Sequence, residues 1–243
     1  MNDAQRRAQY LNALGIQVWT LRNPPVAAAA DVAAAIPVPV ASSPGIAATA
    51  ASQDVALLDW AALQQRVASC SACDLHSTRT QTVFGVGSRN AQWLVIGEAP
   101  GADEDREGEP FVGRAGKLLN EMLRAIGLPR EDVYIANVLK CRPPNNRDPL
   151  PAEVAQCEPY LKRQVQLVQP KIILAVGRIA AQNLLQTDIT IGKLRGQQFS
   201  YEGIPLVVTY HPAYLLRSPA EKRKAWEDLC FARGVWSGTQ AAN

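Results

Sequence analysis

The sequence predicts an α/β fold in which helices cover a central, mainly parallel, four-stranded sheet. Short apolar runs rich in β-branched residues alternate along the chain with longer segments of helical periodicity, and this alternation is typical of parallel sheets. Residues common in functional sites directly follow several of the apolar runs. Because ligands bind outside the carboxyl ends of parallel strands, we expect these residues to share one edge of the sheet.

Eight segments account for the predicted sheet and its helices. The strands are the apolar runs at residues 93–96, 133–139, 171–176 and 206–209. The helices carry apolar residues spaced to bury one face, and they cover residues 114–126, 151–168, 178–185 and 219–232. A helix follows every strand, and such crossovers are what parallel neighbours require.

The composition sets broad limits on function. A chain of 243 residues can bury one core of ordinary size and still carry some unstructured sequence. The formal net charge of +3 neither indicates nor excludes a nucleic-acid partner. No run reaches the roughly eighteen apolar residues of a membrane span. We therefore expect a monomeric cytoplasmic protein with no membrane partner.

The N-terminal residues differ in composition from the rest of the chain. Residues 24–54 are mostly Ala, Pro, Val and Ser, which predicts a flexible linker. In residues 1–23, Tyr10 and Leu14 share a helical face and Gly15 stands where a helix would end. We expect a short helical docking peptide here, with a helix packed on the main domain as the alternative.

Four of the five cysteines are candidates for one shared site. Cys70 and Cys73 form a CxxC pair before the first strand, Cys141 follows the second strand, and Cys157 lies in the next helix. Four thiolates suit either tetrahedral zinc or an iron-sulfur cluster, and the spacing does not decide between them. A thioredoxin-like redox pair is less favoured, because this CxxC ends a helix rather than opening one. Cys230 is expected to be a small core residue.

An ordered set of motifs runs from about residue 65 to residue 233. They are Cys70-Ser71-Ala72-Cys73, Val83-Phe84-Gly85, residues 97–105, residues 110–113, residues 137–143, Cys157 and residues 211–217. Together they resemble the iron-sulfur uracil-DNA glycosylases, often called family four. The resemblance implies that residues 55–236 form a three-layer α/β/α sandwich of the uracil-DNA glycosylase type. It also implies a 4Fe-4S cluster on Cys70, Cys73, Cys141 and Cys157. We expect residues 237–243 to be a disordered tail.

The activity implied by the resemblance is hydrolysis of the bond between uracil and its sugar in DNA, which initiates base excision repair. Phe111 matches the family's stacking aromatic residue, and Asn137 matches the asparagine that reads the edge of the base. His211 is expected to donate a hydrogen bond to uracil O2 during catalysis. The alternatives are structural roles: an aromatic core residue, a strand-end asparagine in a turn and a histidine before proline.

The first motif supplies the remaining expected pocket residues. Ala99 matches the position at which related glycosylases without a cluster have a water-positioning aspartate, and Gly101 matches the position of their thymine-excluding aromatic residue. We therefore expect Glu98 to position water or to order the loop. Glu104 is the candidate for excluding the methyl group of thymine.

Several residues are expected to contact DNA. Tyr214, Leu215 and Leu216 follow the catalytic histidine in an expected loop, where they could enter the gap left by a flipped base. Arg217 and Lys140 are expected to contact phosphates, although each could equally be an ordinary solvated charge. The expected partner is uracil-containing DNA, single- or double-stranded.

The N-terminal peptide carries a second resemblance. Residues 14–22 are similar to the N-terminal peptide of the psi subunit of the bacterial replicative clamp loader. This implies a tether to clamp-loader subunits, with the linker raising the local concentration of the enzyme.

Two other functions remain open from the sequence. One is a non-catalytic, metal-stapled DNA-binding module. The other is a relative that traps uracil covalently. Such relatives carry a histidine-containing insert after the second strand, and residues 141–151 contain no histidine.

Overall fold

The computed structural model describes residues 55–241, with side chains described up to residue 238. The expected docking peptide (1–23) and linker (24–54) lie outside the described residues. Within the described part of the chain, no helix is both long and apolar enough to span a bilayer.

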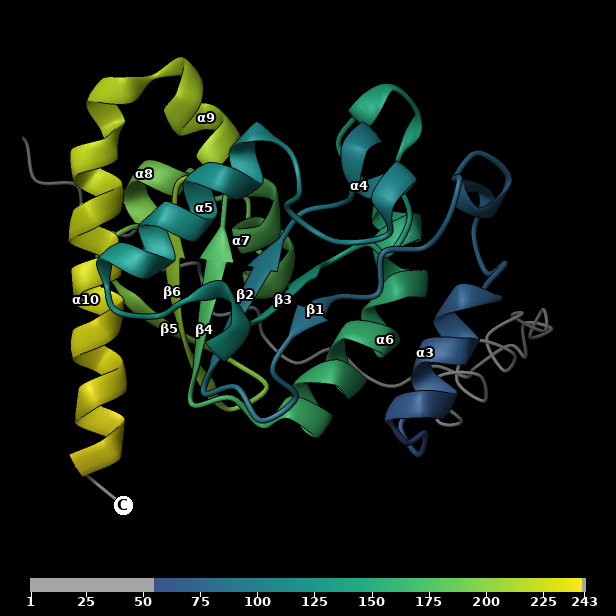
Figure 1. Ribbon diagram of the computed structural model, residues 1–243, viewed down its shortest axis with the longest axis horizontal. Coiled ribbons are helices and arrows are strands. Elements are labelled where there is room, and N and C mark those ends of the chain that lie inside the picture. The colour runs from purple at the N-terminus through teal and green to yellow at the C-terminus, as the bar shows by residue number, and fades with distance from the viewer. Residues whose placement is uncertain (1–54, 242–243) are drawn as a thin grey trace, which may run out of the picture. The chain divides into compact units, whose positions relative to one another are not determined.

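One sheet of six strands runs through the domain, in the order β1-β3-β2-β4-β6-β5 (Figure 1). The four central strands are parallel, and they are β3 (Tyr134–Asn137), β2 (Trp93–Gly97), β4 (Ile172–Val176) and β6 (Ile204–Thr209). They confirm the predicted parallel sheet. The edge strands β1 (Val86–Gly87) and β5 (Gln198–Tyr201) pair antiparallel and were not predicted.

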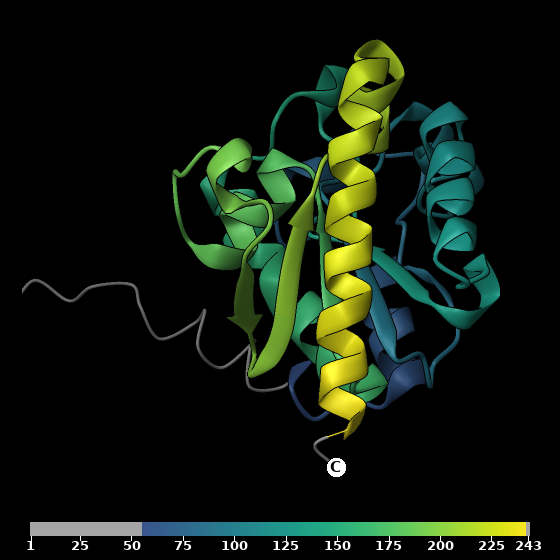
Figure 2. The ribbon, with the colours of Figure 1, turned by 90° about the vertical axis from the view of Figure 1, so that its left-hand side faces the viewer.

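Helices cover both faces of the sheet, which gives the expected three layers (Figures 1 and 2). The hydrophobic core on one face involves α3 (Trp60–Ala68), α6 (Pro151–Val168), α7 (Arg178–Leu185) and α8 (Ile191–Leu194). The core on the other face involves α5 (Arg114–Ala125), α9 (Pro212–Arg217) and α10 (Lys222–Ala241). The remaining helices are α4 (Ala102–Glu107) and the short 3-10 helices η1 (Asp74–Ser77), η2 (Arg130–Asp132), η3 (Pro144–Asn146) and η4 (Pro219–Glu221).

Strand β2 shows why the central strands are apolar throughout. Leu94 and Ile96 belong to the core on the α6 side, whereas Trp93 and Val95 belong to the core on the α10 side. Successive side chains of a strand point to opposite faces, so a strand buried on both faces needs apolar residues at every position.

Helix α10 is longer than the sequence predicted. It continues to Ala241, past the predicted end at residue 232 and into the segment 237–243 expected to be a disordered tail. Trp236 accounts for part of this extension, because its ring packs edge-on against Trp93 and its Nε1 donates to Gln92 Oε1 at 3.1 Å. An aromatic anchor of this kind holds the helix on the sheet beyond the point where the amphipathic pattern fades.

Candidate functional site

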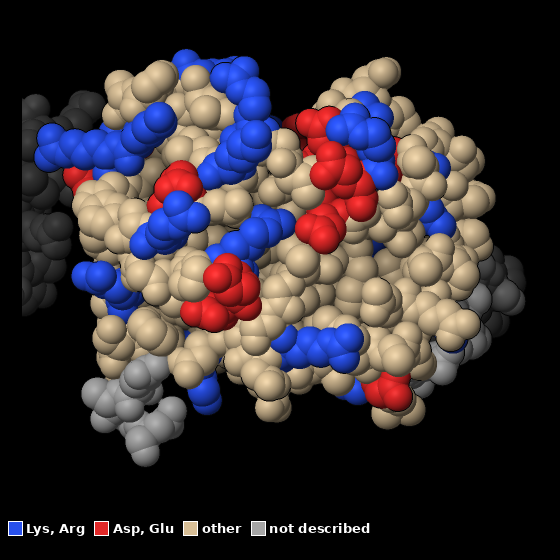
Figure 3. Space-filling model, in the orientation of Figure 1, with Lys and Arg blue, Asp and Glu red and all other residues tan. Residues whose placement is uncertain are grey.

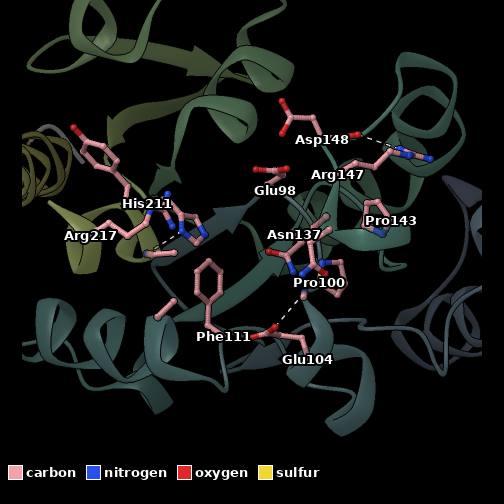
Figure 4. Close-up of a pocket in the computed structure, with 16 residues that line it drawn as sticks. Glu98, Pro100, Glu104, Phe111, Asn137, Pro143, Arg147, Asp148, His211 and Arg217 are labelled. Atoms are coloured by element: carbon pink, nitrogen blue, oxygen red, sulfur yellow. Dashed lines mark hydrogen bonds between the residues drawn. The ribbon is translucent and has the colours of Figure 1, made fainter.

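A cavity of about 480 Å³ lies at the carboxyl ends of the parallel strands. Phe111, Asn137 and His211 all line it, although they are far apart in sequence (Figure 4). Asn137 is the last residue of β3, and His211 follows β6 by two residues. The parallel topology therefore brings together the three side chains expected to surround one base.

Gly97, the last residue of β2, allows two of these side chains to meet. A Cβ atom at this position would lie 2.7 Å from Phe111 Cζ and closer still to Asn137 Oδ1. Real Cβ atoms do not approach other atoms so closely, so any larger residue would displace the ring or the amide. The absence of a side chain at Gly97 thus shapes the floor of the cavity.

Phe111 is fixed in an uncommon backbone conformation. Its φ is +56°, in the left-handed region that non-glycine residues seldom adopt. Arg130 holds the loop from below, because its guanidinium donates to Pro110 O at 2.6 Å and to Phe111 O at 3.4 Å. The Phe111 ring stacks near His211, with the ring centroids 5.5 Å apart. The aromatic face is therefore held in place before any ligand arrives.

Asn137 presents an unsatisfied acceptor within the described structure. The residue is 2% exposed, and its Oδ1 is buried without a hydrogen-bond partner. A buried polar atom left in this state costs about 1–3 kcal/mol. A ligand that brings an N–H group to this oxygen would recover that cost.

His211 is neutral and has a defined tautomer. Its Nδ1 accepts a hydrogen bond from Ala213 N at 3.1 Å, where it caps α9. Burial, with a smaller contribution from the positive charge of Arg217, lowers the pKa of His211 to about 4. Because Nδ1 is the acceptor, the proton of the neutral ring is on Nε2. The side chain can therefore donate a hydrogen bond without carrying a positive charge.

Two glutamates of the first motif line the same cavity. Burial, followed by repulsion from Asp148, raises the pKa of Glu98 to about 7, and Arg178 opposes this rise. Glu104 has a different environment, because its carboxylate accepts from Gly101 N and from Val112 N, each at 3.1 Å. Glu98 can thus exchange a proton near neutral pH, whereas Glu104 ties the two ends of the loop together.

Other residues expected at the site also line the cavity. Ala99, Gly101, Tyr214 and Arg217 are among its lining residues. Leu216 is half-buried and is not one of them. These residues surround the mouth and walls of the cavity.

Two predicted DNA contacts are wrong. Leu215 is 1% exposed and packs in the core against α5 and α10, because residues 212–217 form helix α9 rather than a loop. Lys140 is also 1% exposed, and its Nζ donates to Asn137 O at 2.8 Å. Neither side chain can reach a phosphate or a base stack from the interior of the protein.

One wall of the cavity was missed from the sequence. Pro143, Asn146, Arg147 and Asp148 line it, in the segment between β3 and α6. Arg147 forms a two-pronged ion pair with Glu153 of α6, which anchors this wall. The run of prolines and asparagines after Cys141 is a turn signal that could have placed a loop here.

The four cysteines expected to act as ligands line a second, small cavity. Three of the sulfur atoms receive hydrogen bonds, from Tyr160 Oη to Cys70 (3.3 Å), from Arg79 Nη1 to Cys141 (3.0 Å) and from Lys140 N to Cys157 (3.2 Å). Burial raises the pKa of Cys73, Cys141 and Cys157. Among the residues that the structure describes, no group of His, Cys, Asp or Glu side chains is arranged to hold a metal ion.

Charge is unevenly distributed on the face shown in Figure 3. Acidic side chains gather over α4, whereas basic side chains are spread over α5, α9 and the start of α10 (Figure 3). Arg217 is exposed at the mouth of the cavity on the basic side. A polyanion would be attracted to that side and repelled by α4.

The comparisons with known proteins agree with this geometry. Residues 84–230 match the family model of the uracil DNA glycosylase superfamily. The chain is 52% identical over 173 residues to a type-4 uracil-DNA glycosylase of Archaeoglobus fulgidus, covering 68% of this chain and 87% of the relative. It is 44% identical over 171 residues to the type-4 enzyme of Thermotoga maritima, covering 69% and 89%.

A third relative extends the same pattern. The type-4 uracil-DNA glycosylase of Sulfurisphaera tokodaii is 43% identical over 176 residues, covering 69% of this chain and 80% of the relative. The matched residues include both the base-sized cavity and the four cysteines. The chain therefore belongs to the uracil-DNA glycosylase superfamily, and its relatives place it among the type-4 enzymes.

Proposed function

We infer that the protein is a uracil-DNA glycosylase, a monofunctional hydrolase that takes uracil into the cavity and cleaves its bond to the sugar. The observation that carries this is the meeting of Phe111, Asn137 and His211 around one cavity in a member of this family. Extruding a base from DNA costs a few kcal/mol. Stacking on Phe111 would return about 1–3 kcal/mol of that cost.

Asn137 is proposed to select uracil. Its unsatisfied Oδ1 matches the N3–H group of uracil, and its amide nitrogen can donate to O4. Cytosine presents an acceptor at N3 and a donor at N4, so each contact would set like groups against each other. Each mismatched buried pair would cost about 1–3 kcal/mol.

His211 and Glu98 are proposed to act on bond cleavage. Negative charge develops on uracil O2 as the bond breaks, and the Nε2–H group of neutral His211 can donate to it. An aligned donor of this kind lowers the barrier by about 2.7–4 kcal/mol. The carboxylate form of Glu98 is proposed to orient the attacking water.

The test of this function is turnover on a uracil-containing oligonucleotide. A glycosylase leaves many alkali-labile abasic sites per protein molecule. A covalent uracil trap would stop at one event per molecule, and a DNA-binding module would leave none, so either outcome would reject the proposal. Single- and double-stranded substrates should both be used, because a single strand has no base pair to open.

The cysteine cavity is proposed to hold a 4Fe-4S cluster. The support is the donor set, since four thiols from three parts of the chain line one cavity and three of them receive hydrogen bonds. A cluster is larger than one ion, so its ligands need not converge on a single point. When bound, it would tie these chain segments together. A brown protein with absorbance near roughly 400 nm is expected, whereas stoichiometric zinc and no colour would reject the cluster.

The basic side of the cavity mouth is proposed to carry the DNA backbone. Arg217 is exposed there, and its replacement with Ala should weaken binding to all DNA sequences and reduce the salt dependence. We also propose that the enzyme acts as a monomer in the cytoplasm, whose reducing conditions keep thiols such as Cys70 and Cys73 available as ligands.

The N-terminal peptide is proposed to dock on clamp-loader subunits. The support is the similarity of residues 14–22 to the psi peptide, and these residues lie outside the described part of the chain. A pull-down should compare the full chain with a Leu14→Asp, Trp19→Ala double variant. Equal recovery of clamp-loader subunits by the two proteins would reject this partner.

A further inference from the structure

Lys140 is a fully buried charged residue that lies between the two sites. Its side chain is 1% exposed, and its Nζ donates to the backbone carbonyl of Asn137 at 2.8 Å. The same residue lines the cysteine cavity. Burying an ammonium group costs several kcal/mol unless an opposite charge lies nearby. The negative groups that favour its charge are the thiolates of Cys157 and Cys141.

The backbone around Lys140 is also held from both sides. Its N–H group donates to Cys157 Sγ at 3.2 Å, and its carbonyl accepts from Val83 N at 2.8 Å. Cys141 is the next residue along the chain. The turn that starts at Asn137 thus ends at a cysteine of the second cavity, and the Lys140 side chain folds back across it.

We propose that Lys140 is a positioning residue that couples the cysteine site to base recognition, since the cysteine thiolates hold its ammonium group and the ammonium group holds the carbonyl of Asn137. The inference rests on the proposed cluster and on the proposed role of Asn137. The amide of Asn137 distinguishes uracil from cytosine only while it keeps one orientation. Lys140 fixes the backbone that carries this amide, and the charge needed for this is balanced at the cysteines.

Three substitutions separate the charge of Lys140 from its hydrogen bond. Lys140→Met removes both and keeps an unbranched apolar chain of similar length. Lys140→Gln keeps a donor without the charge, and Lys140→Arg keeps the charge. Lys171→Met is the matched control, because it removes the same charge from an exposed position. Each protein is purified with its iron, and its iron content is measured before use.

Two measurements are then made on the iron-loaded proteins. The first is single-turnover excision of uracil, and the second is the rate at which an iron chelator bleaches the absorbance near roughly 400 nm. Lys140→Met should excise uracil about tenfold or more slowly, as expected for the loss of a hydrogen bond to a charged group, and should bleach faster than the wild type. Lys140→Arg should bleach more slowly than Lys140→Met. Lys140→Gln should recover part of the excision rate but not the resistance to bleaching.

The inference is overturned if iron-loaded Lys140→Met excises uracil at the wild-type rate or bleaches at the wild-type rate. It is also overturned if Lys171→Met has the same effects as Lys140→Met. Should Lys140→Met fail to fold, Lys140→Gln is judged by bleaching alone, and bleaching at the wild-type rate overturns the inference. The wild type serves as the separate check, because a colourless or inactive wild-type protein would reject the proposed function itself.

Discussion

His211 and Glu98 face the same cavity but hold their protons over different ranges of pH. Burial lowers the pKa of His211 to about 4, so the ring is neutral at any pH well above that value. Burial and the charge of Asp148 raise the pKa of Glu98 to about 7, so this carboxyl group changes charge near neutrality. One buried environment thus favours the uncharged form of both groups, with opposite consequences for the direction of their pKa shifts.

Replacing His211 with Ala should slow uracil excision about 10²–10³-fold, which is the usual effect of losing one donor to a developing oxyanion. The fold should survive, because only the cap of α9 is lost with the side chain. Single-turnover kinetics measure the effect. The other histidine, His76, is exposed and does not line the cavity, so His76→Ala should keep the wild-type rate. Equal loss in both variants would contradict the assignment.

The rate of excision should rise with pH through about 7. If the carboxylate of Glu98 orients water, protonation removes the active form, so the rate at pH 6 should be about tenfold below its plateau at high pH. The neutral form of His211 predominates throughout this range and adds no second limb. A pH profile from 5.5 to 9 tests this directly. Glu98→Gln should be slower and independent of pH, whereas a profile in which the variant still rises would show that another group titrates.

Sequence reasoning succeeded where a residue's role follows from its motif and failed where it depends on packing. The sequence predicted that Phe111, Asn137 and His211 would share a cavity, because each follows or lies near a strand of one parallel sheet. Lys140 was assigned to a phosphate, since a lysine is seldom buried. Its burial depends on thiols that are close in space, including one at residue 157, and no local pattern announces that proximity.

At the scale of elements, the long central strands were predictable and the short edges were not. β1 has only two residues and β5 has a half-exposed pattern, so neither carries a strong period of its own. Helix α9 has six residues, and its proline at the first turn can equally begin a loop. Both failures concern elements whose existence depends on a neighbour rather than on their own sequence.

The end of β6 is anchored to α10 by a buried ion pair. Arg195 donates to Asp228 Oδ2 at 2.7 Å, and Thr209 of β6 donates to the same oxygen at 2.8 Å. The Arg195 guanidinium also lies 4.7 Å from the centre of the Tyr210 ring, next to His211 in sequence. This cluster therefore supports the strand end that carries the catalytic histidine.

Asp228→Ala should lower the free energy of unfolding by about 3 kcal/mol or more, because it leaves a largely buried guanidinium without its partner. Urea unfolding measures the change. Glu227→Ala is the control one residue away, where an exposed pair with Arg223 is lost and a change of about 0–1 kcal/mol is expected. If the two variants are equally stable, the ion pair does not anchor the strand.

At the scale of the whole molecule, the sheet separates two cores with different means of stabilisation. The core on the α10 side is built from apolar side chains of α5, α9 and α10. The core on the α6 side includes Cys141 and Cys157, and Cys70 and Cys73 pack against it. Four cysteines from the segment after α3, the turn after β3 and helix α6 therefore join this side of the domain. The alternation of strands and helices predicted both layers, but the sequence could not show which layer depends on the cysteines.

Loss of the cluster should therefore loosen one side of the domain before the other. Without it, the buried thiols would be uncharged and would no longer link α3, the turn after β3 and α6. Hydrogen exchange measured on Cys73→Ser should show faster exchange in α3, in residues 70–80 and in residues 138–157. Amides of α5 and α10 should keep their protection, because their core contains none of the four cysteines. Cys230→Ser, which changes a half-buried cysteine of α10, should leave the α6 side unaffected. Uniform loss of protection in Cys73→Ser, or none at all, would mean that the cysteine site does not stabilise this layer on its own.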